Sequence, residues 1–78
     1  MRPEGERDLK VVVWENIEKY RKERDLSQIE LCKLVGYNSV QYSKNKKRPK
    51  SVTFPVLQRF AYILRVKTID LIDDWSEE

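Results

Sequence analysis

The chain concentrates its positively charged side chains in one short segment. Residues 44–50, KNKKRPK, supply five basic side chains in seven positions. The 78-residue chain has a net charge of +3, yet residues 19–50 alone carry ten basic and three acidic residues, and each flanking segment carries three basic and five acidic ones. Such a concentration of charge is typical of a surface that binds a polyanion. A solvated loop that only keeps a small protein soluble is the alternative.

The residues that usually perform catalysis or bind metals are scarce. The sequence contains no histidine and a single cysteine, Cys32. Without an imidazole, the commonest general base is missing, the thiol has no partner to activate it, and no zinc ligand set exists. Carboxylates alone can perform acid–base chemistry, but a domain this small leaves little room for two distinct carboxylate environments. We therefore expect no enzyme, cofactor, metal or small-molecule substrate.

Composition and length indicate one small globular domain. The residues are 40% hydrophobic and 37% charged, a balance too apolar for disorder. By surface scaling, a chain of this size buries roughly 60% of its surface on folding, enough for one core. No run of about 18 apolar residues suggests a membrane span, and the N-terminus lacks the apolar segment of a signal peptide. These features predict a cytoplasmic protein.

The first predicted helix carries Val13, Ile17 and Tyr20 at helical spacing, with polar residues on its other face. Asp8 is a candidate N-cap for this helix. Because three β-branched valines follow one another, residues 9–13 are either the first turns of the helix or an extended segment. Both alternatives agree with the sequence.

Residues 27–46 are predicted to form two helices joined by a tight turn. Ser27 and Glu30 have the spacing of a capping box at the start of the first of these helices. Gly36 tolerates the left-handed conformation that ends helices. Asn38 is then a good N-cap for the next helix. The segment therefore predicts a helix, a turn and a helix.

The helix expected from Ser39 to Asn45 is unusually polar. Its clearly apolar residues are Val40 and Tyr42, so it cannot bury a broad apolar stripe. We expect Tyr42 to anchor it and most of its other side chains to point outward.

Two further helices complete a predicted all-α fold of five helices. Thr53 can cap the fourth helix, with Pro55 tolerated in its first turn. Thr68 can cap a short fifth helix that extends through Trp75.

Several of these segments together resemble a known family. The sequence LSQIEL, followed by Cys32, Gly36 and NSVQYS, is similar to the helix-turn-helix of the Cro and phage-repressor type, the XRE family. Further along, the chain matches the family pattern LxxIAxxLxV at Leu57, Phe60, Ala61, Leu64 and Val66. The similarity covers about residues 13–75 and implies a compact, lambda-repressor-like domain. We assign residues 9–76 to this domain and residues 1–8 to a flexible N-terminal arm.

The resemblance implies a transcriptional regulator, a repressor, that binds double-stranded DNA with its third helix in the major groove. The residues that match the base-reading face are Asn38, Ser39, Val40, Gln41 and Lys44. Gln28 matches the position that meets the DNA backbone, where a helix N-terminus favours a phosphate. We assign to phosphates also the neighbouring polar and basic residues Ser43, Lys46, Lys47, Arg48 and Lys50. Such a protein would associate with the nucleoid through DNA.

One departure from the family pattern concerns charge. The family usually pairs an arginine at the position of Arg21 with a glutamate at the position of Lys46. In this chain both residues are basic, so that ion pair cannot form.

We expect a homodimer, because one short helix reads few base pairs and a second half-site adds affinity and specificity. Trp75 and Ile72 are candidate contacts. Trp14 and Trp75 either pack together in the core or provide an exposed patch for dimerisation.

Two alternatives to a regulator remain at this stage. A degenerate helix-turn-helix can serve as a protein-interaction module or an antitoxin-like partner. The run KKRPK also fits a nuclear import signal. Binding to random duplex at low salt separates a DNA-binding protein from an adaptor.

Overall fold

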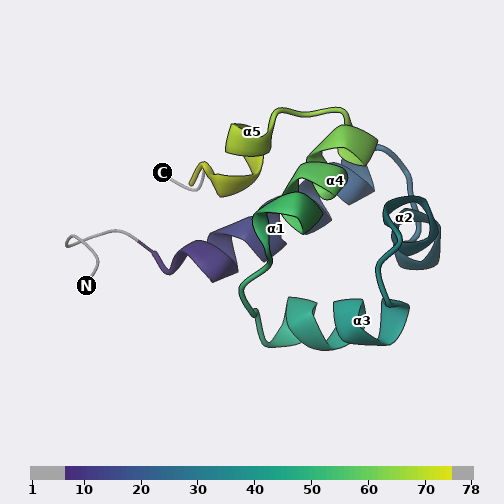
Figure 1. The fold of residues 1–78 in the computed structure, drawn as a ribbon, viewed down its shortest axis with the longest axis horizontal. Helices are drawn as coiled ribbons and strands as arrows, with labels where there is room; N and C mark the ends of the chain where they lie inside the picture. The colour runs from purple at the N-terminus through teal and green to yellow at the C-terminus, as the bar shows by residue number, and fades with distance from the viewer. Residues whose placement is uncertain (1–6, 75–78) are drawn as a thin grey trace.

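Five α-helices packed around one core make up residues 7–74, the part of the chain that this computed structural model describes (Figure 1). These residues contain no β-strand. The helices are α1 (Leu9–Glu23), α2 (Gln28–Val35), α3 (Ser39–Lys47), α4 (Phe54–Leu64) and α5 (Thr68–Ile72). The predicted all-α, five-helix fold is confirmed. Within residues 7–74, no helix combines the length and apolar character needed to span a membrane.

Helix α1 begins immediately after Asp8, whose carboxylate accepts a hydrogen bond from the backbone N–H of Lys10. The valines at 11–13 are therefore helical, and the extended alternative is wrong. Val12 and Val13 are almost completely buried. Their burial outweighs the modest helix propensity of β-branched residues.

The segment from α2 to α3 has the predicted caps. The Ser27 hydroxyl accepts from the N–H of Glu30 at 3.0 Å, and the Glu30 carboxylate accepts from the N–H of Ser27 at 2.8 Å. Gly36 ends α2 with φ of 81°. The Asn38 side-chain oxygen then accepts from two backbone N–H groups of α3 at 2.9 and 3.0 Å. These local contacts alone set both ends of the turn.

The prediction for α5 is wrong in two details. Lys67, not Thr68, is the N-cap residue, and its N–H donates to the Asp70 carboxylate at 2.9 Å. Helix α5 ends at Ile72, where the buried Asn16 amide of α1 donates to the carbonyls of Leu71 and Asp73. A side chain from a distant helix thus helps to fix where α5 stops. Trp75, its expected last residue, lies outside the described residues.

The core is centred on three aromatic rings from three helices. Trp14 of α1 contacts Tyr42 of α3 edge-on, with ring centroids 5.2 Å apart, and Phe60 of α4 at 6.0 Å. All three side chains are buried. Cys32 is also buried, and this burial raises the pKa of its thiol. As predicted, Tyr42 anchors α3, and Cys32 packs in the core as a small apolar side chain.

Candidate nucleic-acid interface

Helix α3 lies along one edge of the molecule, on the side opposite α5 (Figure 1). It buries only Tyr42 and Asn45. Val40, Gln41 and Lys44 are exposed, with Val40 60% accessible. Because positions 40, 41 and 44 share one face of a helix, these side chains form a continuous outward surface.

The first two residues assigned to base reading also build the start of α3. Asn38 is exposed, but its side-chain oxygen is occupied by the cap. The amide nitrogen is the part of this side chain that the cap does not use. Ser39 is half-buried, and its backbone carbonyl lies 3.4 Å from Nε2 of Gln28. Asn38 and Ser39 therefore flank the outward surface and are more constrained than Val40 or Gln41.

Gln28 and Ser43 lie together, although fifteen positions separate them in the sequence. The Gln28 amide donates to the Ser43 hydroxyl, and both side chains are half-buried. This hydrogen bond joins the start of α2 to the middle of α3. Both residues are predicted phosphate contacts, and the structure brings them to one place beside the N-terminus of α2.

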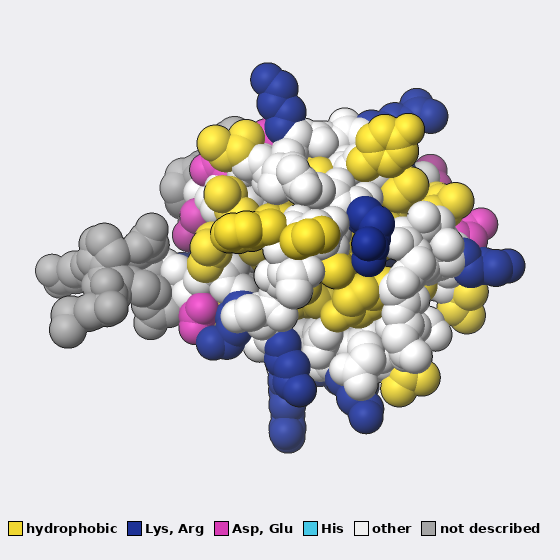
Figure 2. Space-filling view, viewed as in Figure 1, with side chains coloured by type: hydrophobic (Ala, Val, Ile, Leu, Met, Phe, Trp, Pro, Cys, Tyr) yellow, Lys and Arg dark blue, Asp and Glu magenta, His cyan; other side chains and the backbone are white. Residues whose placement is uncertain are grey.

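The basic side chains at the end of α3 and just after it point in two different directions. Lys47, Arg48 and Lys50 are exposed and, with Lys44 and Asn45, line a hollow of about 390 Å³. Basic side chains project from the edge of the molecule where α3 lies (Figure 2). Lys46 instead lies toward α1, with its Nζ 3.8 Å from Oε1 of Glu18.

Glu18 of α1 is the acidic residue at this interface that the sequence interpretation missed. Arg21 donates to both of its oxygens, at 2.9 and 3.0 Å, and the Tyr42 hydroxyl donates to Oε2. Burial alone would raise the pKa of Glu18, but the hydrogen bonds from Arg21 and Tyr42 and the charges of Arg21 and Lys46 outweigh it and lower the pKa. The spacing of three between Glu18 and Arg21 on one helix was the available signal.

Arg21 and Lys46, which cannot form an ion pair with each other, both lie near the Glu18 carboxylate. The glutamate that the family usually carries on the third helix has a counterpart here on α1. Because Glu18 contacts Tyr42 and lies near Lys46, it connects α1 to α3 where the family's usual ion pair is missing.

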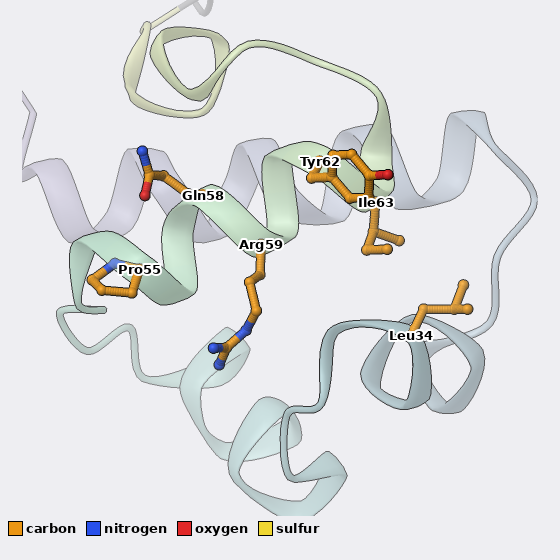
Figure 3. Close-up of a pocket in the computed structure, with 6 residues that line it drawn as sticks. All are labelled: Leu34, Pro55, Gln58, Arg59, Tyr62 and Ile63. Carbon is orange, nitrogen blue, oxygen red and sulfur yellow. The ribbon is translucent and has the colours of Figure 1, made fainter.

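A shallow groove elsewhere on the surface runs between α2 and α4 (Figure 3). Leu34 of α2 lies across from Tyr62 and Ile63 of α4, while Arg59 extends toward the side on which α3 lies. The lining residues are Leu34, Pro55, Gln58, Arg59, Tyr62 and Ile63. This set includes no carboxylate, thiol or imidazole, so the groove offers no pair of groups for acid–base chemistry.

Comparison with known proteins agrees with this geometry. The family model of the Cro/C1-type HTH DNA-binding domain matches residues 16–75. A solved structure, the crystal structure of the hypothetical transcription factor NHTF from Neisseria, has a TM-score of 0.80 and 22% sequence identity. The match covers 87% of this chain and 78% of that chain, and at this identity it shows a shared fold. No curated protein matches the chain.

Proposed function

The chain belongs to the Cro/C1-type helix-turn-helix DNA-binding domain family, and from this premise we propose that it is a sequence-specific transcriptional repressor. Helix α3 is the proposed recognition helix. The observation that supports this role is that α3 buries two side chains and presents Val40, Gln41 and Lys44 on one outward face. A major groove about 12 Å wide admits a single helix of this kind.

The side chains on the outward face of α3 suit the edges of bases. Gln41 and the amide of Asn38 can pair with adenine, Lys44 can donate to guanine, and Val40 can contact a thymine methyl group. Ser39 is the fifth residue of the proposed base-reading set. Its half-buried position favours a contact at the edge of the groove.

The proposed phosphate contacts flank this surface. Gln28 and Ser43 lie at the N-terminus of α2, where unpaired backbone N–H groups favour an anion. Lys47 at the C-terminal end of α3, and Arg48 and Lys50 just after it, supply positive charge. A duplex in contact with α3 can therefore be bound through its backbone on both sides of the helix. We propose that the protein acts in the cytoplasm and associates with the nucleoid in this way.

The proposed functional unit is a homodimer on a near-palindromic operator, with the two α3 helices about 34 Å apart. Leu9, Phe54 and Ile72 support this assembly, because they are exposed apolar side chains around one groove between α1, α4 and α5. Light scattering of the free protein and of its complex with a selected operator tests the dimer. A monomer in both samples would contradict it.

The decisive experiment is selection of bound sequences from a random duplex pool, followed by affinity measurements at several salt concentrations. We expect Gln41→Ala and Lys44→Ala to relax preference at one or two base pairs, by roughly 1–3 kcal/mol each. Lys47→Met and Lys50→Met should weaken operator and random duplex alike. Each should lower the salt slope by about 0.9 for every phosphate that the protein no longer neutralises.

Lys67→Met is the matched control, because Lys67 is exposed and caps α5, on the side opposite α3. It should leave both affinities and the salt slope close to those of the parent protein. If loop variants changed sequence preference and helix variants changed only the salt slope, α3 would not be the recognition helix. Failure to bind any duplex at low salt would favour a protein-interaction module or antitoxin-like partner.

A further inference from the structure

Helix α3 has few attachments to the rest of the protein. Its buried side chains are Tyr42 and Asn45, and each makes a polar contact outside α3. Asn45 donates to the Tyr37 hydroxyl at 2.8 Å, and the Tyr42 hydroxyl donates to Glu18. The Gln28–Ser43 hydrogen bond is a third polar anchor of α3. With few such anchors, removal of one of them leaves the helix freer to rotate or shift.

Glu18 is the anchor that carries charge. Its side chain is 16% exposed, and it faces Tyr42 and Lys46, which lie one turn apart on α3. Hydrogen bonds to a charged acceptor are shorter and stronger than those between neutral groups. An ionised Glu18 therefore favours one orientation of α3 about its own axis.

The Glu18 carboxylate also attracts the Lys46 ammonium group and so favours side-chain conformations of Lys46 that point toward α1. Lys46 Nζ lies 3.8 Å from Glu18, whereas no carboxylate within residues 7–74 lies within ion-pairing distance of Lys47. Lys47 also has an exposed side chain. A phosphate that approached Lys46 would have to compete with Glu18 for its charge.

We propose that Glu18 is a positioning residue for the recognition helix and keeps Lys46 from contacting the DNA backbone. The negative charge on Glu18 then raises the ratio of the affinity for operator to the affinity for random duplex. This inference rests on the proposed function, in which α3 reads DNA. It assigns Lys46 a role different from that of Lys47, Arg48 and Lys50.

The test compares Glu18→Gln with Glu15→Gln. Both variants remove one negative charge from α1, but Glu15 pairs with Arg7 and not with a residue of α3. We expect Glu18→Gln to lower the preference for operator over random duplex about ten-fold, the effect of removing one charge-assisted hydrogen bond. It should also bind random duplex more tightly, with a salt slope steeper by about 0.9, because Lys46 becomes available to a phosphate.

A second pair of variants isolates Lys46. In the parent protein, Lys46→Met should change random-duplex affinity by less than about two-fold, whereas added to Glu18→Gln it should reverse the increase in affinity. Lys47→Met should weaken binding in both backgrounds. If Lys46→Met weakened the parent protein as much as Lys47→Met does, Lys46 would contact a phosphate directly and the proposal would be wrong.

Hydrogen exchange without DNA separates this inference from the proposed function. In Glu18→Gln, amides of α3 should exchange several-fold faster relative to those of α4, and in Glu15→Gln they should not. If this change appears but no variant binds duplex, the positioning of α3 stands while its role in DNA binding fails. If the parent protein binds an operator and the two glutamine variants behave alike, the role of Glu18 is overturned.

Should Glu18→Gln fail to fold, the comparison of Lys46→Met with Lys47→Met still decides whether Lys46 contacts DNA.

Discussion

The indole nitrogen of Trp14 donates a hydrogen bond to the backbone carbonyl of Lys50 over 2.8 Å. The same ring packs edge-on against Tyr42 of α3. One buried side chain of α1 therefore contacts both α3 and the basic segment that follows it. This arrangement fixes the position of that segment relative to α3, although its own side chains are exposed.

Replacing Trp14 by phenylalanine should destabilise the domain and loosen the segment around Lys50. The change removes the hydrogen-bond donor and part of a buried ring, so we expect a decrease of roughly 2–4 kcal/mol in the free energy of unfolding. Denaturant unfolding followed by circular dichroism measures it. Tyr62→Phe is the control, because Tyr62 is 81% exposed, and it should stay within about 0.5 kcal/mol of the parent protein. Equal stability of the two variants would show that the indole contact contributes nothing.

Substitution of Gly36 should lower the stability of the domain because of the backbone conformation at this position. Its φ is 81°, and a Cβ built at this position meets no atom within 4 Å. The expected cost of Gly36→Val is therefore conformational, about 1–2 kcal/mol. Gly36→Asn should cost less, because asparagine adopts the left-handed conformation more readily. Thermal unfolding of both variants tests this order, and a valine variant as stable as the asparagine variant would contradict it.

The sequence predicted best those features that depend on neighbouring residues. Ser27 with Glu30, Gly36 and Asn38 lie within a few positions of the backbone groups they satisfy. The helix-turn-helix could therefore be predicted from types and spacing alone. The end of α5 could not be predicted in this way. The Asn16 amide, which donates to the Leu71 carbonyl there, lies 55 positions earlier in the sequence.

The polar contacts that connect α1 to α3 and to the basic segment after it could not be predicted, for a similar reason. Glu18 and Tyr42 are 24 positions apart, and Trp14 and Lys50 are 36 apart. Their pairing depends on how α1 packs against α3, which periodicity does not specify. The outward residues of α3 were easier to predict, because a helix with few apolar residues must expose most of its side chains.

Asn38 has two proposed roles that substitutions can separate. Its side-chain oxygen caps α3, and its amide nitrogen is proposed to reach a base. Asn38→Asp keeps a capping oxygen, so we expect stability within about 0.5 kcal/mol of the parent protein. The carboxylate cannot donate and repels phosphates, so operator binding should weaken by about ten-fold or more.

Asn38→Ala is the matching variant for the capping role. It removes the cap and should cost about 1 kcal/mol of stability. Denaturant unfolding and operator binding on the same samples distinguish the two roles. If Asn38→Asp bound the operator as well as the parent protein does, Asn38 would be only a cap.

The lowered pKa of Glu18 predicts how stability depends on pH. The groups that face it are Arg21 on α1, Cys32 on α2, and Tyr42 and Lys46 on α3. Side chains of these four types ordinarily titrate far above pH 4. Because the folded-state pKa lies below the unfolded value of about 4.3, the charged form stabilises the fold above that value. This contribution disappears as the pH falls through the folded-state pKa.

The free energy of unfolding should therefore fall more steeply between about pH 5 and pH 2 in the parent protein than in Glu18→Gln, whose side chain does not titrate. Some acid dependence should remain in the variant, because hydrogen bonds from the Ser27 backbone and hydroxyl groups also lower the pKa of Glu30. Urea unfolding at several pH values across this range measures both curves. A Glu18→Gln curve parallel to that of the parent protein would mean that the charge on Glu18 does not stabilise the contact between α1 and α3.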